Sequence, residues 1–180
     1  MVTNWQRIDG KWYHFDNSGA MQKGWVSVDG EWYYLNTSGA MVTGWNNIGN
    51  KWFYFTSSGV MQTGWQAINN NWYYFNSSGN MLTGWQKIAG SWYYFSSSGA
   101  MATSWMKIDN NWYYFGSSGK MTTGWAKIGN TWYYFNTAGS MVTGWANISG
   151  KYYFFYSSGA MASNTYISSY HVNASGVWDN

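Results

Sequence analysis

A strict twenty-residue repeat constrains this chain more than any other feature of its sequence. Methionine stands at position 1 and then at every twentieth residue as far as Met161. Tryptophan keeps the same spacing from Trp5 to Trp145. A second tryptophan stands seven residues after each of these from Trp12 to Trp132, and Tyr152 replaces it after Trp145. Units this short cannot bury a core alone, so they must stack on their neighbours. The 180 residues therefore predict one repeat array instead of separate globular domains.

Composition excludes several classes of protein. Aromatic residues make up 23% of the chain and charged residues 8%, so the chain is too apolar to be disordered. No apolar run approaches the roughly 18 residues of a membrane span. The net charge of +3 is spread along the chain without a basic run, which argues against a nucleic-acid partner and suits an anionic polymer. Because cysteine is absent, disulfides and thiolate metal sites are excluded.

Each repeat predicts one β-hairpin followed by one loop. Two short runs flank a two-residue turn such as Asp9-Gly10 or Asn69-Asn70, whose residues tolerate the positive φ of a type I′ turn. The second run, Trp-Tyr-Tyr-Phe in most repeats, is strongly strand-forming. A polar loop with a recurring glycine closes the unit. We therefore expect an all-β solenoid of stacked hairpins.

The turn also sets the strand register, so the two faces of a hairpin can be assigned. With Asp9-Gly10 as the turn, Arg7 lies opposite Trp12, and opposed residues share a face. One face of the first hairpin then carries Trp5, Arg7, Trp12 and His14, and the other carries Gln6, Ile8, Tyr13 and Phe15. The second face, with its recurring isoleucine, predicts the core of the array. The first face, with two tryptophans, is the candidate binding face.

The binding face suggests a box for a cation. We expect the two tryptophans of one hairpin to meet a tyrosine one period later, as Trp5 and Trp12 would meet Tyr34. Three π faces around a gap attract a bulky, weakly hydrated cation, of which quaternary ammonium is the best case. A primary ammonium would lose hydrogen-bonded water and find no regular carboxylate there. The same rings could equally serve to hold the hairpins together, because aromatic stacking is itself stabilising.

Residues suited to catalysis are scarce. The six acidic residues form no recurring pair of the kind that glycosidases use. His14 and His171 are far apart and predict no metal site. We expect no catalytic activity and no metal or other cofactor.

The repeat resembles a known family. The pattern Gly-Trp-x-x-Ile-x-x-x-Trp-Tyr-Tyr-Phe-x-x-x-Gly-x-Met-x-Thr, as in residues 64–83, is similar to the choline-binding (cell-wall-binding) repeats of bacterial surface proteins and lytic enzymes. The resemblance implies a left-handed superhelix of hairpins with choline bound between consecutive hairpins. It also implies attachment to phosphocholine on teichoic or lipoteichoic acid at the bacterial cell wall, and pairing of two copies through the C-terminal hairpin. Met1 is already in register as a repeat methionine, which favours a segment of a larger secreted or released protein.

In the family, two tryptophans of one repeat and a tyrosine of the next form the choline cage, helped by a methionine. Carried over, the resemblance implies the sets Trp5, Trp12, Tyr34; Trp25, Trp32, Tyr54; Trp45, Trp52, Tyr74; Trp65, Trp72, Tyr94; Trp85, Trp92, Tyr114; Trp105, Trp112, Tyr134; and Trp125, Trp132, Phe154.

The end of the chain departs from the pattern. Trp145 and Tyr152 have only Tyr170 or His171 beyond them, which leaves an eighth set in doubt. We expect the repeats to occupy residues 1–164 and a divergent capping hairpin to occupy residues 165–180. Related repeats bind glucan in glucosyltransferases and carbohydrate in large toxins, so carbohydrate is the alternative ligand.

Overall fold

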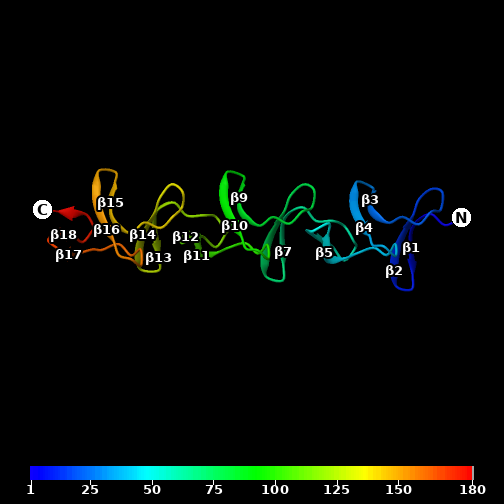
Figure 1. The fold of residues 1–180 in the computed structure, drawn as a ribbon, viewed down its shortest axis with the longest axis horizontal. Coiled ribbons are helices and arrows are strands. Elements are labelled where there is room, and N and C mark those ends of the chain that lie inside the picture. Colours follow the sequence, from blue (N-terminus) through cyan, green and yellow to red (C-terminus); the bar gives the residue numbers. More distant parts are fainter. Residues whose placement is uncertain (180) are drawn as a thin grey trace. The chain divides into compact units, whose positions relative to one another are not determined.

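The computed structural model describes residues 1–179, which form a succession of antiparallel hairpins (Figure 1). Within these residues no helix is long and apolar enough to cross a membrane. The two-stranded sheets pair β1 (Asn4–Ile8) with β2 (Lys11–Phe15), β3 (Gly24–Val28) with β4 (Glu31–Leu35), β5 (Gly44–Ile48) with β6 (Lys51–Phe55), β7 (Gly64–Ile68) with β8 (Asn71–Phe75), β9 (Gly84–Ile88) with β10 (Ser91–Phe95), β11 (Ser104–Ile108) with β12 (Asn111–Phe115), β13 (Gly124–Ile128) with β14 (Thr131–Phe135), and β15 (Gly144–Ile148) with β16 (Lys151–Phe155).

The hairpin turns have the backbone conformation that their sequence predicts. Asp109 and Asn110, for example, have φ angles of 47° and 66°. Positive φ at both central residues defines the type I′ turn, whose twist matches that of the strands. The predicted register is confirmed, since Arg7 lies opposite Trp12 and Trp5 lies opposite His14.

Most loops fold around one polar side chain at their first position. In the second repeat, Asn36 Oδ1 accepts hydrogen bonds from the Ser38 and Ala40 amides at 2.9 and 3.0 Å. Asp16 plays the same role in the first repeat, and the hydroxyl of Ser18 donates to it. That hydrogen bond is the main cause of the lowered pKa of Asp16, because it favours the charged carboxylate. The loop thereby reverses the chain within a few residues.

The residue after each loop ties its hairpin to the preceding one. Met41 follows the loop of the second hairpin, and its amide donates to the carbonyl of Trp12 in the first hairpin at 2.8 Å. On its other side Met41 forms an isolated bridge with Leu35. Met61 makes the equivalent bond to Trp32, also at 2.8 Å. The twenty-residue spacing of methionine is thus the spacing of a backbone link between hairpins.

The chain divides into two compact units. The first comprises Met1–Gly84 with Phe95–Met101, and the second comprises Trp85–Tyr94 with residues from Ala102 onward. In each unit the residue that ends the second strand of a hairpin forms the centre of the core, except for Phe15 of the first hairpin, which is only partly buried. Side chains with no exposed surface are Leu35, Phe55, Phe75 and Phe95 in the first unit, and Phe115, Phe135, Phe155 and Val172 in the second.

The isoleucines of the predicted core face contribute less to the core than expected, whereas the phenylalanine of the same face is fully buried in most repeats. Ile68 and Ile108 are buried, with 6% and 7% of their surface exposed, but Ile8 is 46% exposed. The phenylalanine at the end of the second strand is therefore the residue on which burial depends. Since an isolated two-stranded hairpin is marginal in water, stacking must supply its stability, at about 25 cal/mol per Å² of apolar surface buried.

The expected C-terminal hairpin is present, and a third strand extends it into a three-stranded sheet. β17 (Thr165–Ile167) pairs with β18 (Tyr170–Val172), which pairs with β19 (Trp178–Asp179). The divergence of this last repeat is as expected, but the third strand was not predicted. Residue 180, the end of the expected capping segment, lies outside the described residues.

A strained turn residue offers a stability test. Ala89 is exposed and has φ 47°, a conformation that costs an L-residue other than Asn, Asp or Gly about 1 kcal/mol. We expect Ala89→Asn to raise the free energy of unfolding by about 0.5–1 kcal/mol, measured as the midpoint of urea unfolding. Asp109→Asn at the equivalent turn position is the control and should leave the midpoint nearly unchanged. An equal gain from both variants would contradict the explanation.

Candidate ligand-binding grooves

Consecutive hairpins meet through opposite faces. Trp25 shares its own face with Tyr34, directly across the hairpin, at a centroid distance of 5.1 Å. The next hairpin turns its other face toward Trp25, so that Phe53 lies 4.9 Å and Phe55 5.9 Å from the indole. The predicted binding face of one hairpin and the predicted core face of the next are therefore two sides of a single interface.

This stacking changes which ring the next hairpin supplies. We expected Tyr34 beside Trp5, but Tyr33 is the ring that contacts Trp5, at 4.8 Å. Alternation along β4 points Tyr34 to the far side, where it packs on Trp25. The face assignment within a hairpin was right, and the assumption that like faces meet between hairpins was wrong.

The same correction applies to the expected sets along the chain. Tyr54, Tyr74, Tyr94, Tyr114, Tyr134 and Phe154 pack on the first tryptophan of their own hairpin, at 5.0–5.3 Å. The rings contributed by the following hairpin within a unit are Tyr33 to Trp5, Phe53 to Trp25, Tyr73 to Trp45, Tyr113 to Trp85, Tyr133 to Trp105 and Tyr153 to Trp125, at 4.7–4.9 Å.

The one phenylalanine expected among the third rings lies in a different groove as a result. The Trp125 set was predicted to contain Phe154 as its third ring, but it contains Tyr153. The groove with phenylalanine at this position is that of Trp25, where Phe53 stands. Whether any of these rings binds a ligand stays a prediction.

The first complete groove shows how the walls are assembled. Trp5 and Trp12 come from the first hairpin, Tyr33 from the second, Met41 from the residue after its loop, and Ser58 from the following loop. Together they line a cavity of about 300 Å³. The second unit contains an equivalent cavity of about 380 Å³ lined by Trp85, Trp92, Tyr113, Met121, Thr137 and Ala138.

The two tryptophans of a hairpin stand nearly at right angles. Their centroids are 6.3–6.5 Å apart with interplanar angles of 80–88°. The second tryptophan keeps a face free, since Trp12 and Trp92 are each 42% exposed. Two perpendicular indoles and a third ring form a corner that presents π surface from several directions.

The methionine wall is held in place by a glycine of the next loop. A Cβ built on Gly59 would overlap the thioether of Met41, and Gly79 stands in the same relation to Met61. Met41 therefore has little freedom to move away from the groove of Trp5 and Trp12. The polarizable thioether adds a fourth soft wall.

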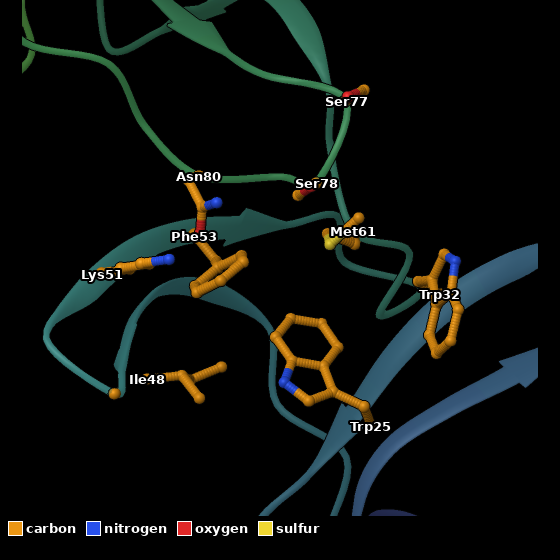
Figure 2. Close-up of a pocket in the computed structure, with 10 residues that line it drawn as sticks. Trp25, Trp32, Ile48, Lys51, Phe53, Met61, Ser77, Ser78 and Asn80 are labelled. Atoms are coloured by element: carbon orange, nitrogen blue, oxygen red, sulfur yellow. The ribbon is translucent and has the colours of Figure 1, made fainter.

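The Trp25 groove is larger than the Trp5 and Trp85 grooves and has more polar side chains in its walls. Figure 2 shows Trp25, Trp32 and Phe53 with Met61 beside a loop that carries Ser77, Ser78 and Asn80. Lys51 and Ile48 line the opposite part of the cavity, which measures about 710 Å³.

The sequence predicted only part of the aromatic cluster at the C-terminal end. Trp145, Tyr152 and Tyr170 were considered as an eighth set, but the fourth ring, Trp178, was missed. Trp178 is a tryptophan that does not fall on the twenty-residue spacing, and this was the signal in the sequence that could have identified it.

The grooves favour a soft cation over an anion or a metal ion. No carboxylate lines the Trp5, Trp25 or Trp85 groove. Residues 1–179 contain no cluster of three potential metal ligands. One cation already approaches an indole face, since Lys87 Nζ lies 6.0 Å from the ring centroid of Trp92. Cation–π attraction is the interaction that such walls can offer.

Comparison with known proteins points in the same direction. A model of the choline-binding repeat matches residues 2–43, 42–83, 82–123, 102–141 and 122–166. No curated protein sequence matches the chain.

Several solved structures are similar to this one. Choline binding protein F of Streptococcus pneumoniae, solved with a peptidoglycan analogue, is 45% identical with a TM-score of 0.90 over 94% of this chain, which spans 62% of that protein. CbpJ of the same species is 38% identical with a TM-score of 0.93, covering 99% of this chain and 71% of that one. The choline-binding domain of CbpL is 33% identical with a TM-score of 0.68, covering 100% and 98%.

The contact between Gly59 and Met41 gives a test of the groove's architecture. Gly59 and Gly64 have φ angles of 84° and 68°, so Gly59→Ala and Gly64→Ala both place alanine at a positive φ. Only the new Cβ at position 59 would overlap a side chain, that of Met41. We expect Gly59→Ala to displace Met41 and to lower stability by about 1 kcal/mol more than Gly64→Ala. Thermal unfolding gives the difference, and the NMR signal of the Met41 methyl group reports its displacement. An unchanged methyl signal in Gly59→Ala would contradict this packing.

Proposed function

Because the chain belongs to the choline-binding repeat family, we propose that it binds choline in the grooves between consecutive hairpins and has no catalysis of its own. The observation that carries the proposal is the three-ring corner that recurs within both units: two perpendicular tryptophans, a third ring from the next hairpin and a methionine. A trimethylammonium group suits these walls, since it has no hydrogen-bond donors to satisfy and its methyl groups bury against the rings.

Each single site has a low affinity for choline, and the array as a whole reaches a high avidity. Cation–π contacts of about 0.5–2 kcal/mol each, with burial of three methyl groups, give single sites in the millimolar to upper micromolar range. The natural ligand is then a polymer that carries choline repeatedly, and several sites engaged at once raise the avidity far above that of one site. Phosphocholine on teichoic or lipoteichoic acid has this chemistry. The protein would accordingly act at the bacterial cell surface as the attachment module of a larger protein.

The polymer also fits the charge of the chain. Its phosphates are anionic, and the chain has a net charge of +3 without a basic run. Lys107 lies directly across its hairpin from Trp112, and Lys127 lies directly across from Trp132. Lys87 Nζ lies 6.0 Å from the ring centroid of Trp92. We propose that these lysines contact the phosphates of the polymer.

Competition on a resin tests the ligand class. We expect the chain to be retained by a quaternary-amine resin and to elute with millimolar choline, because free choline competes for each weak site. Ethanolamine, which has the same skeleton without the methyl groups, is the control and should not elute it at equal concentration. Retention that choline does not disturb, together with binding to dextran, would favour the carbohydrate alternative and exclude this proposal.

Two substitutions of Tyr133 distinguish a cation cage, which needs a π face, from a sugar site, which needs the phenol hydroxyl. Tyr133 supplies the third ring of the Trp105 and Trp112 groove. Tyr133→Phe should keep choline binding, since the wall needs a π face and Phe53 already serves in another groove. Tyr133→Leu should weaken binding in that groove by about tenfold.

The readout is the indole N–H signals of Trp105 and Trp112 during a choline titration, with those of Trp5 and Trp12 as an internal reference. Loss of binding in Tyr133→Phe would show that the phenol hydroxyl makes the essential contact, which the proposed cation cage does not require.

A further inference from the structure

A thioether recurs in the walls of the repeat grooves described above. Met41, Met61 and Met121 line these cavities, and each is only partly buried, so its sulfur can be reached through the groove. Every repeat keeps methionine at this position, although the next residue varies among Gln, Val, Leu, Ala and Thr. We propose that the groove methionines are modification sites for a peroxide oxidant and that their sulfoxides lower the affinity of the grooves for ligand. The effect on affinity rests on the proposed function, whereas the oxidation and its effect on the groove walls do not.

Hydrogen peroxide alone balances the oxidation. A lone pair of the thioether sulfur attacks one peroxide oxygen, so that an S–O bond forms and the O–O bond breaks. The leaving oxygen takes the proton of the attacked oxygen and departs as water. Sulfur loses two electrons and the peroxide gains two. The product is uncharged, polar and reducible by methionine sulfoxide reductases, so the modification is reversible.

The packing around the sulfur decides where the new oxygen points. A Cβ built on Gly59 would overlap the sulfur of Met41 and both of its neighbouring carbons, so the loop fills that side of the thioether. The loop resists displacement, because the amides of Gly59 and Val60 donate to the carbonyl and the Oγ1 of Thr56 at 2.9 and 3.0 Å. The backbone of Met41 is held by its 2.8 Å hydrogen bond to Trp12. The sulfoxide oxygen is therefore directed into the groove.

The other described grooves have the same arrangement. Figure 2 shows Met61 between the loop that carries Ser78 and the rings of Trp25 and Trp32. In that loop a Cβ at Gly79 would overlap the thioether of Met61. Gly139 stands in the same relation to Met121 in the second unit. An oxygen added to either sulfur has free space only on the side of the cavity.

An oxygen in this position opposes the binding of a methylated cation. The sulfoxide oxygen is a hydrogen-bond acceptor that water satisfies in the open groove. A trimethylammonium group has no donor to replace that water, so binding would desolvate the oxygen without compensation. The oxygen also takes space from a cavity that measures about 300 Å³ in the groove of Met41. Because the array binds through many sites, oxidation of several grooves would lower its avidity far more than oxidation of one.

Met21 is an internal control for this chemistry. It packs against Gly39 as Met41 packs against Gly59, and it is 40% exposed. The two tryptophans that face Met41 from the preceding hairpin have no counterparts for Met21 in this chain. Oxidation of Met21 thus changes the same packing without changing a ligand groove.

The device is confined to the repeats. The C-terminal cavity is lined by Trp145, Tyr152, Tyr170 and Trp178, with no methionine among its walls.

Peroxide footprinting of the full chain tests the sites. The folded protein is treated with hydrogen peroxide for increasing times, and the mass of each methionine-containing peptide is followed. We expect oxidation of Met21 and of the groove methionines. Choline should slow the oxidation of Met41, Met61 and Met121 several-fold and leave that of Met21 unchanged, because only the first three lie under a bound ligand. Groove methionines that stay reduced while Met21 is oxidised would overturn the inference.

The indole N–H signals measure the consequence of oxidation. Oxidation of Met41 should shift the signals of Trp5 and Trp12 with no ligand present and weaken their response to choline by about tenfold. Met41→Leu removes the sulfur and keeps an apolar wall of similar volume. In this variant Trp5 and Trp12 should keep their choline response after peroxide treatment, while Trp85 and Trp92 lose theirs.

Two controls accompany this measurement. Met21→Leu should protect neither groove from peroxide. Treatment of the oxidised chain with both methionine sulfoxide reductases should restore the choline response, since each enzyme reduces one epimer. If Met41→Leu itself binds no choline, Met121→Leu in the second unit must give the corresponding protection of the Trp85 groove.

The outcomes separate this inference from the proposed function. Trp5 and Trp12 signals that do not move although Met41 is oxidised would overturn the inference, and so would an equal loss of response in Met41→Leu. An untreated chain in which no tryptophan signal responds to choline would contradict the proposed function. In that case the shift of the Trp5 and Trp12 signals on oxidation without ligand still decides whether the sulfoxide enters the groove.

Discussion

The fold depends on the contact between the first tryptophan of one hairpin and the opposite face of the next. Trp45 packs on Tyr73 at 4.8 Å and on the fully buried Phe75 at 5.7 Å. The amide of Met81 completes the contact with a 2.8 Å hydrogen bond to the carbonyl of Trp52. No hairpin of five-residue strands can bury these rings by itself, so each repeat owes its stability to its neighbour.

The proposed binding site is the part of this interface that does not close. The first tryptophan and the buried phenylalanine seal the inner end, while the second tryptophan stands about half exposed at the outer end. Folding and binding thus use the same rings, which explains why the grooves are preformed. Preformed walls of low polarity lose little entropy on binding but offer no ionic partner, which is why the proposed function relies on many weak sites acting together.

The grooves are not copies of one another. Phe53 removes a hydroxyl from one groove, where Lys51 and Asn80 add polar walls. The C-terminal cavity replaces methionine with Trp178. The scaffold tolerates such changes because the backbone links and the buried phenylalanine set the spacing of hairpins, and the wall residues beyond them are free to differ. A repeat array can in this way carry grooves of graded chemistry on one type of scaffold.

Local sequence alone determined the hairpins, their turns, their register and the residues on each face, because these follow from the φ preferences of two turn residues and from strand alternation. The identity of the third ring did not follow. Tyr33 and Tyr34 are adjacent and chemically identical, and only the stacking of opposite faces decides that Tyr33 meets Trp5 while Tyr34 meets Trp25. Trp178 was equally out of reach, since its place depends on β19 pairing with β18, a contact between segments with no periodic signal. Tertiary packing decided both.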